Sequence, residues 1–442
     1  MKKAFIIGLD SAPPGIIFDR KEEFPNISKL IDNGVSAKMR SIHPPITIPA
    51  WMAMATGKDA GALGIYGFRQ REGASYAGIR LSMASDFIDP AIWDIIGAKG
   101  KKSVLVSVPP SYPPLPVNGF RVSCFMTPDA ERDYTYPAAL KKEIEDKYGP
   151  FIFDVPFRKG SKSKLKDDLF KMADQHIGVL KYLMITKPWD LCMYVDIGAD
   201  RVQHAFWEHP DIVVDYYKKM DRGIGELLEG LDDDTVVFIV SDHGAKTMKG
   251  SFAINQWLMD KGYLVLDESP KKGLEIEKAK VNWSKTKVWA WGGYYARIFF
   301  NVMGREEKGI IPPMRYEIWR DKLIDEIEDI KGPGGEKWIT RAARPEEYYK
   351  EIKGDSPDLM VYFDDLSYRA AGTMGHESVY LSENDTGPDG AMHDWDGIFV
   401  MYDPLDKRPR RLDTISILDV APTILDVMGF VIPSDMRGKS IL

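Results

Sequence analysis

Residues 236–244 read VVFIVSDHG and carry the clearest structural signal in the chain. A run of apolar, mostly β-branched residues is followed at once by Ser241, Asp242 and His243. An apolar run of this length without polar alternation is typical of a strand buried on both faces of a sheet. Functional sites in open α/β sheets form outside the carboxyl ends of the strands. We therefore predict a buried strand whose end places Asp242 and His243 at such a site.

Similar apolar runs recur along the chain and alternate with segments of helical periodicity. The other predicted strands are Ala4–Leu9, Ser103–Val108, Leu191–Val195 and Gly397–Tyr402. The clearest predicted helices are Asp167–Thr186, Tyr216–Leu231 and Ser416–Met428. Strands that alternate with helices indicate an α/β fold. We predict a mostly parallel central sheet with helices on both faces.

A different composition marks the segment from 267 to 375. It is rich in Lys, Glu, Trp, Gly and Pro, and it shows no clear buried strand before Leu359–Phe363. We predict that residues 267–375 form an inserted, smaller α+β subdomain, and that residues 1–266 plus 376–442 form the α/β core. Within the insertion, the segment Trp289–Tyr295 is either a cap over the site or an edge hairpin.

Composition and charge narrow the classes of function. With 44% hydrophobic and 28% charged residues in 442 positions, the chain is globular and long enough for a large core. Two cysteines rule out a disulfide scaffold and a cysteine zinc cluster. A net charge of −7 argues against a nucleic-acid polymer as a partner. No apolar run approaches the ~18 residues of a membrane helix, and Ala4–Leu9 is too short for a signal peptide, so we expect a cytoplasmic protein that binds no membrane. The sequence carries no signal for an oligomeric state.

Further carboxylates stand close to the ends of predicted strands. Asp10 ends the first of them, a position that a simple turn residue often occupies. Asp200 and His204 are four residues apart, which on a helix places both side chains on one face, where they can hold a divalent ion. A solvated helical pair is the simpler interpretation of that spacing. Asp196 competes with Asp200 as a ligand because it lies nearer the strand end.

A hydroxyl and a third histidine complete the candidates. Thr47 precedes Pro49, a residue suited to the first turn of a helix, so the hydroxyl would lie among backbone N–H groups that bind anions. An ordinary N-cap threonine would give the same pattern. His393 directly precedes the last predicted strand, where a lone histidine is more often structural than a ligand.

Taken together, the candidates supply three aspartates, three histidines and a hydroxyl, most of them at strand ends of one sheet. That set is large enough for two metal sites. Histidine and aspartate ligands suit Zn²⁺ best, with Mn²⁺ as the alternative. Two divalent ions about 4 Å apart can bind the attacking and leaving oxygens of a phosphoryl displacement. The histidines predicted not to be ligands are His43, His176, His209 and His376.

Seven motifs occur in a characteristic order: GLDSAPP at 8–14, PPITIPAWMAMATGKDAGALGIYGF at 44–68, DRVQHAFW at 200–207, VSDHG at 240–244, FAINQWLMDKGYL at 252–264, NVMGREEKGII at 301–311, and HDWDGIFVMYDP followed by SILDVAPTILDVMG. This order resembles the alkaline phosphatase superfamily. Within it, the chain is most similar to the type I phosphodiesterase/nucleotide pyrophosphatase branch and to a group of prokaryotic predicted phosphohydrolases or phosphomutases. The ordered set spans nearly the whole chain and is specific, although no single motif is.

The resemblance implies a role for each candidate. Asp10, Asp242 and His243 would bind one ion that also touches Thr47, and Asp200, His204 and His393 would bind the other. The family pattern of an aspartate, three residues and a histidine favours Asp200 over Asp196. Thr47 would be the nucleophile, forming a covalent phospho-threonine that water then releases. The expected partner is a small phosphorylated substrate, with a nucleotide as one option, cleaved at a phosphodiester or pyrophosphate bond.

Other branches of the superfamily supply alternatives. Sulfatases need a Cys or Ser converted to formylglycine with an Arg shortly after, whereas this chain has Thr47 and Trp51. A phosphomonoesterase or phosphomutase would share the covalent step, with Arg69 or Arg201 as its phosphate-binding arginine. A non-catalytic metal- or phosphate-binding protein is the alternative from another class, and the complete ligand set argues against it.

Overall fold

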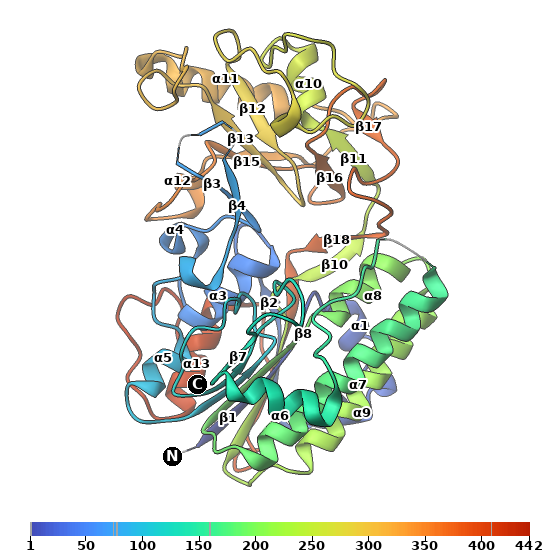
Figure 1. The fold of residues 1–442 in the computed structure, drawn as a ribbon, viewed down its shortest axis with the longest axis vertical. Helices are drawn as coiled ribbons and strands as arrows, with labels where there is room; N and C mark the ends of the chain where they lie inside the picture. The colour runs from blue at the N-terminus through green and yellow to red at the C-terminus, as the bar shows by residue number, and fades with distance from the viewer. Residues whose placement is uncertain (1, 74, 77, 159–160, 408) are drawn as a thin grey trace. The chain divides into compact units, whose positions relative to one another are not determined.

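The computed structural model describes residues 2–73, 75–76, 78–158, 161–407 and 409–442. The chain forms two compact units, each built from separate stretches of sequence (Figure 1). The first unit comprises Met1–Leu63, Ser82–Ala245 and His393–Leu442. The second comprises Gly64–Leu81 and Lys246–Met392.

A ten-stranded sheet forms the centre of the first unit, in the order β20-β2-β19-β9-β1-β8-β5-β6-β7, with β21 beside β2. Strand β1 (Lys3–Leu9) lies between β8 (Leu191–Asp196) and β9 (Thr235–Val240) and is parallel to both. The other strands are β2 (Val35–Arg40), β5 (Ser103–Val106), β6 (Gly119–Val122), β7 (Thr135–Tyr136), β19 (Asp396–Tyr402), β20 (Arg410–Arg411) and β21 (Ile415–Ser416). The predicted α/β class with a mostly parallel sheet is confirmed.

Strand β19 runs against the prevailing direction. It pairs antiparallel with both β2 and β9. Its residues Gly397–Met401 are buried, like those of the parallel strands. An apolar run reports burial on both faces and not direction, so the sequence could not show that this strand is reversed.

Helices cover both faces of the sheet (Figure 1). On one face α7, α8 and α9 pack against one another, and α2 packs against α9 and β19. On the other face α13 packs against α3 and α5. The helices of this unit are α1 (Pro14–Ile17), α2 (Pro25–Asn33), α3 (Thr47–Thr56), α4 (Ala60–Leu63), α5 (Ile92–Gly97), α6 (Ala139–Tyr148), α7 (Lys162–Thr186), α8 (Gly198–Phe206), α9 (Pro210–Leu228) and α13 (Val420–Val427).

The second unit has a core of its own around antiparallel strands. One sheet has the order β12-β13-β15-β14 and another the order β16-β11-β17. The segment Trp289–Tyr295 belongs to the hairpin of β12 and β13, so the edge-hairpin interpretation describes its structure. The elements of this unit are β3 (Arg69–Arg71), β4 (Ile79–Leu81), β11 (Gly250–Ala253), α10 (Ile254–Asp260), β12 (Val288–Trp291), β13 (Ala296–Phe300), α11 (Tyr316–Glu328), β14 (Arg341–Ala343), α12 (Pro345–Tyr348), β15 (Leu359–Tyr362), β16 (Tyr368–Ala371) and β17 (Tyr380–Leu381). Strands β10 (Gly244–Thr247) and β18 (Ala391–Asp394) pair with each other, and each contains residues of both units.

The boundaries of the second unit differ from the expected 267 and 375. Strand β11 pairs with β16, and α10 packs on β12. The buried residues Phe252 and Leu258 therefore belong to the second core. The stretch 64–81 also joins this unit, far from it in sequence. The apolar stretch around 252–264 has the same character as the first core, so composition alone could not assign it to the second.

Candidate active site

Strand ends and one helix bring the predicted residues together in the first unit. Asp10 follows β1, and Asp242 and His243 follow β9, which is parallel and adjacent to β1. Asp200 and His204 lie on α8, which begins two residues after β8 ends. All five side chains are buried. Parallel neighbouring strands end at the same edge of the sheet, which explains why residues so far apart in sequence meet.

Asp10, Asp242 and His243 form a first group whose ligand atoms all lie within 4.8 Å of one another. The Nε2 atom of His243 is 3.1 Å from Oδ2 of Asp242 and 3.8 Å from Oδ1 of Asp10. The hydroxyl of Thr47, the first residue of α3, lies 3.5 Å from the same Nε2. These distances suit atoms gathered around a shared cation.

A second group gathers around Oδ1 of Asp200. The Nε2 atoms of His204 and His393 are 3.1 Å and 3.7 Å from this oxygen. The rings of His393 and His243 stack with centroids 3.7 Å apart, so the two groups are adjacent. The ligand atoms of Asp200, His243 and His393 likewise lie within 4.8 Å of one another, whereas His204 joins this set only through its short distance to Asp200. Adjacent ligand clusters of this kind can hold a pair of ions.

Backbone carbonyls orient two of the imidazoles. The Nδ1 atom of His243 donates to the carbonyl of Gly244 at 3.0 Å, and that of His393 donates to the carbonyl of Pro45 at 2.8 Å. A carbonyl oxygen only accepts, so Nδ1 carries the proton in both rings. The Nε2 lone pairs are therefore directed to the centre of the site, as in metal-binding histidines whose other nitrogen donates to a carbonyl.

Each of the three carboxylates has one oxygen held by the protein and one that accepts no hydrogen bond from the described residues. The oxygens without a donor are Oδ1 of Asp10, Oδ1 of Asp200 and Oδ2 of Asp242. The held oxygens accept from Trp51 Nε1 (2.8 Å), Arg201 Nη1 (2.7 Å) and the backbone N–H of Ser11 (3.1 Å), respectively. Buried carboxylate oxygens are rarely left without a donor. The donor set therefore fits divalent cations bound on the inner side of each carboxylate.

Burial and mutual repulsion dominate the electrostatics. Burial raises the pKa of Asp10 well above its ordinary value, and Asp200 raises it further. Burial, together with the charge of Asp10, does the same to the pKa of Asp242. Burial alone would also raise the pKa of Asp200, but His204 and Arg201 outweigh it and hold that pKa well below its usual range. Burial lowers the pKa of His243 to about 4, so its imidazole is neutral and able to bind a metal at neutral pH.

Trp51 and Ser11 orient the carboxylates of the first group, a role that the sequence did not indicate. Trp51 follows Thr47 by one helical turn on α3 and donates to Asp10. A Cβ atom at Gly8 would lie 2.3 Å from Cη2 of Trp51, so only glycine in β1 leaves room for this indole. Ser11 has a φ of 62°, a left-handed conformation that costs on the order of 1 kcal/mol and turns its N–H to Asp242.

Two residues weighed as alternatives in the sequence have other partners in the structure. Both oxygens of Asp196 accept hydrogen bonds, from the hydroxyls of Tyr194 and Tyr216 and from the N–H of Ala199. Its carboxylate is thus oriented by these donors, and Asp196 belongs to neither ligand group of the described residues. Arg201 lies between Asp200 and Asp154, with its Nε and Nη2 each 2.8 Å from the latter, and is engaged by carboxylates on two sides.

The histidines predicted not to be ligands take no part in the two groups formed by the described residues. His176 is fully buried on α7 and bonds to the carbonyl of Ile152 at 2.7 Å. The ring of His43 packs against that of Trp395, with the centroids 4.7 Å apart and the planes tilted by 47°. His376 lies in the second unit.

The family model for type I phosphodiesterase / nucleotide pyrophosphatase matches residues 4–396. The match covers most of the chain, and the chain therefore belongs to this family. A search of curated proteins gave no match. Fold and family together place the protein among the hydrolases that cleave phosphodiester or pyrophosphate bonds of small substrates, a family that generally uses divalent metals. In the described part of the chain, no helix is both long enough and apolar enough to cross a bilayer.

Proposed function

We propose that the chain is a two-metal phosphodiesterase or pyrophosphatase that uses Thr47 as its nucleophile. One ion would be held by Asp10, Asp242 and His243 beside Thr47. The other would be held by Asp200, His204 and His393. Histidine and carboxylate ligands favour Zn²⁺, with Mn²⁺ as the alternative.

One observation carries this proposal: the three donor-free carboxylate oxygens lie in the two adjacent groups that also contain the inward-facing imidazoles. Burying three carboxylates together is costly unless cations offset their charge. A purely structural cluster would direct its hydrogen-bond donors at both oxygens of each carboxylate. Here the donors hold one oxygen of each and leave the other to the interior of the site.

In this proposal Thr47 would attack a phosphorus bound at these groups. Its side chain is buried, and its Oγ1 lies beside His243. As the first residue of α3, it also stands where the backbone N–H groups of a helix have no acceptor within the helix, and such groups can bind a non-bridging phosphate oxygen. When bound, the divalent ions would supply a lowered pKa for the hydroxyl and stabilisation of the attacking and leaving oxygens.

The reaction has two displacements. In the first, the bond from Thr47 Oγ1 to phosphorus forms as the bond to the leaving oxygen breaks, and the hydroxyl proton passes to solvent. In the second, water attacks the phospho-threonine, the Oγ1–phosphorus bond breaks, and Thr47 recovers a proton. Covalent catalysis of this kind divides one difficult step into two easier ones.

The surroundings of Arg201 support a diester over a monoester. A monoester carries an additional negative charge and therefore benefits from a cationic side chain beyond the metals. The guanidinium of Arg201 is already engaged by Asp154 and Asp200. Arg69, the other candidate, is exposed on β3 of the second unit.

A paired assay tests the proposal. The protein would be reconstituted with Zn²⁺ or Mn²⁺ and assayed with bis-p-nitrophenyl phosphate and p-nitrophenyl phosphate in parallel. We expect a higher kcat/KM for the diester. A preference for the monoester would favour a phosphatase or mutase. No turnover of either compound, with both ions bound, would favour a non-catalytic binding protein.

A further inference from the structure

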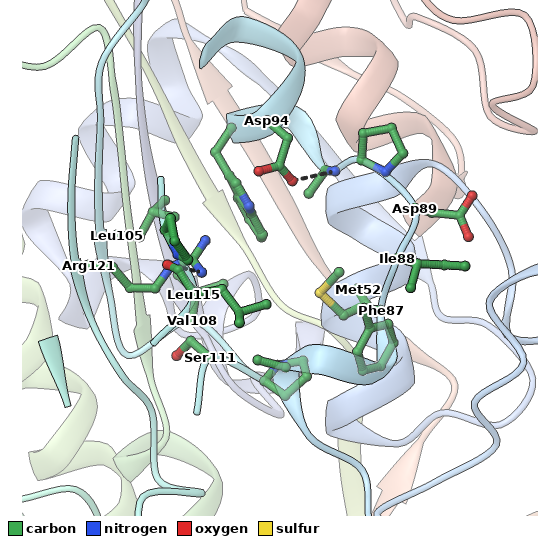
Figure 2. A pocket seen from close by; sticks show the side chains of 16 residues that line it. Met52, Phe87, Ile88, Asp89, Asp94, Leu105, Val108, Ser111, Leu115 and Arg121 are labelled. Carbon is green, nitrogen blue, oxygen red and sulfur yellow. Dashed lines mark hydrogen bonds between the residues drawn. The ribbon is translucent and has the colours of Figure 1, made fainter. Parts of the chain in front are cut away.

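A cavity of about 340 Å³ lies in the first unit between α3, α5 and the strands β5 and β6. Figure 2 shows Arg121 on one wall, with Met52, Phe87 and Ile88 on the other. Its volume falls at the lower end of the range of small-molecule pockets. Neither Thr47 nor any of the proposed metal ligands lines it, so this cavity is separate from the proposed active site.

Arg121 is the unusual feature of this cavity. The residue is only 5% exposed, and burial lowers the pKa of its guanidinium. Its Nη1 donates to the carbonyl of Leu115 at 2.9 Å, whereas its Nε has no acceptor among the described residues. A buried cation is ordinarily paired with a carboxylate, because an unpaired buried charge is costly. Asp94 acts on Arg121 electrostatically and raises its pKa against the effect of burial, but no carboxylate of the described residues forms an ion pair with the guanidinium.

The unpaired edge of the guanidinium has a defined shape. With Nη1 occupied by Leu115, the edge formed by Nε and Nη2 is left, and two parallel N–H groups of this kind match the two oxygens of a carboxylate. The Oγ of Ser111, which also lines the cavity and is 4% exposed, has no hydrogen-bond partner among the described residues. Two buried donors without acceptors in one cavity point to a ligand that brings the acceptors.

Charge and polarity define the class of ligand. Apart from Arg121, the charged residues of the lining are Asp89, which is paired with Lys58, and Asp94, whose Oδ2 accepts from the N–H of Ala91 at 3.0 Å. Arg121 is the only cation in the described lining, and Asp94 already lies in the same lining. The cavity therefore suits a ligand with one negative charge better than a ligand with two. The remaining walls are largely apolar and include Met52, Leu105, Val108 and Leu115.

We propose that this cavity binds a small organic carboxylate with an apolar body, its carboxylate on Arg121 and Ser111 and its hydrocarbon part against Met52, Leu105 and Val108. Trp93 lies with its ring 5.8 Å from the guanidinium carbon and forms part of the same wall. The bound carboxylate would supply the counter-charge that the described residues do not provide for Arg121 as an ion pair.

Isothermal titration of the chain of residues 1–442 with hexanoate tests this proposal. We expect saturable binding, with a Kd of about 1 mM or tighter. The same titration with 1-hexanol, which has the body without the charge, should be at least tenfold weaker. Hexyl phosphate, which is largely dianionic at neutral pH, should also bind more weakly than hexanoate.

Two variants distinguish the contribution of the Arg121 guanidinium to hexanoate binding from general effects of mutation. Arg121→Met should weaken hexanoate binding by about 10- to 100-fold, the range expected for a charge-assisted hydrogen-bonded pair. Arg132→Met, at an arginine outside the cavity lining whose side chain is 63% exposed, is the matched control and should bind hexanoate like the wild type.

A second pair of variants keeps the test decisive if Arg121→Met does not fold. Ile88 lines the cavity but is 90% exposed, so it tolerates a charge without loss of packing. Ile88→Asp should weaken hexanoate binding by about fivefold and Ile88→Lys should strengthen it, while hexanol binding stays unchanged. Absence of saturable hexanoate binding, equal affinity for hexanoate and hexanol, or full affinity in folded Arg121→Met would overturn the proposal, whatever the outcome of the hydrolase assays.

Discussion

The indole N–H of Trp51 donates to Oδ2 of Asp10 at 2.8 Å, and Trp51 lies one helical turn from Thr47. One helix therefore carries both the proposed nucleophile and the donor that orients a carboxylate of the first metal group. The hydrogen bond turns the other oxygen of Asp10, Oδ1, to the cluster, where it accepts no hydrogen bond from the described residues. The position of the hydroxyl and the orientation of the carboxylate are thus linked through α3.

Trp51→Phe should lower the affinity for Zn²⁺ by about 10- to 100-fold, because Asp10 loses the donor that fixes its orientation. The phenyl ring keeps an aromatic group at this core position but lacks the indole atoms Cη2 and Cζ3 that lie beside Gly8, so circular dichroism is used to check that the variant folds. A competitive metal titration measures the change. Trp189→Phe is the matched control, because the indole of Trp189 bonds to the carbonyl of Met184 instead. Equal losses in both variants would refute the role assigned to Trp51.

Thr47→Ala should reduce kcat/KM for bis-p-nitrophenyl phosphate by about a thousandfold or more, since the nucleophile is removed while the metal ligands remain. Thr47→Ser should retain substantial activity because it keeps the hydroxyl. Acid quenching during turnover, followed by mass spectrometry, should find phosphate on Thr47 in the wild type. Full activity in the alanine variant would exclude Thr47 as the nucleophile.

Arg201→Met should make metal binding more sensitive to acid. Burial raises the pKa of Asp200, and Arg201 is one of the groups that hold it down, so loss of the guanidinium lets protons compete with the metal at higher pH. We expect the Zn²⁺ affinity to fall more at pH 5.5 than at pH 7.5, by roughly tenfold at the lower pH. Arg222→Met, at an exposed position on α9, serves as the control. Parallel pH profiles in wild type and Arg201→Met would contradict this prediction.

His176 should make the stability of the metal-free protein depend on pH. Burial lowers its pKa from 6.5 to about 4 in the folded state. Between these values the unfolded state binds more protons, so the free energy of unfolding should fall as the pH drops from 6.5 to 4, by about 3 kcal/mol in total from this residue. Urea unfolding of the wild type and of His176→Gln across this interval measures the contribution. An identical pH dependence in the two proteins would show that His176 contributes nothing.

Part of this site can be predicted from the sequence, because several of its residues directly follow predicted strands. Asp10, Asp242 and His243 were identified because each follows an apolar run, and adjacent parallel strands bring such residues together. The i, i+4 spacing of Asp200 and His204 likewise predicted two side chains on one face, and α8 places them so. Local pattern and sheet topology are enough for these placements.

The features that the sequence did not predict depend on packing between distant segments. The tyrosine hydroxyls that orient Asp196 come from β8 and α9, and no local pattern shows that they converge on it. For the hydrogen bond from Trp51 to Asp10 the sequence offered one signal: Trp51 is four residues after Thr47, which on a helix places both side chains on one face. No sequence signal indicated that residues 64–81 belong to the second unit. Contacts between this segment and residues more than 160 positions later leave no periodicity in the sequence.

Metal stoichiometry separates the two-ion site from its alternatives. After reconstitution with Zn²⁺ and removal of loosely bound metal, elemental analysis of active wild-type protein should give two ions per chain. His204→Ala should lose one of them, whereas His209→Ala, at a histidine outside both groups, should keep both. Two ions in the wild type with a selective loss in His204→Ala would support the proposed ligand groups. One ion or none in a fully active sample would contradict them.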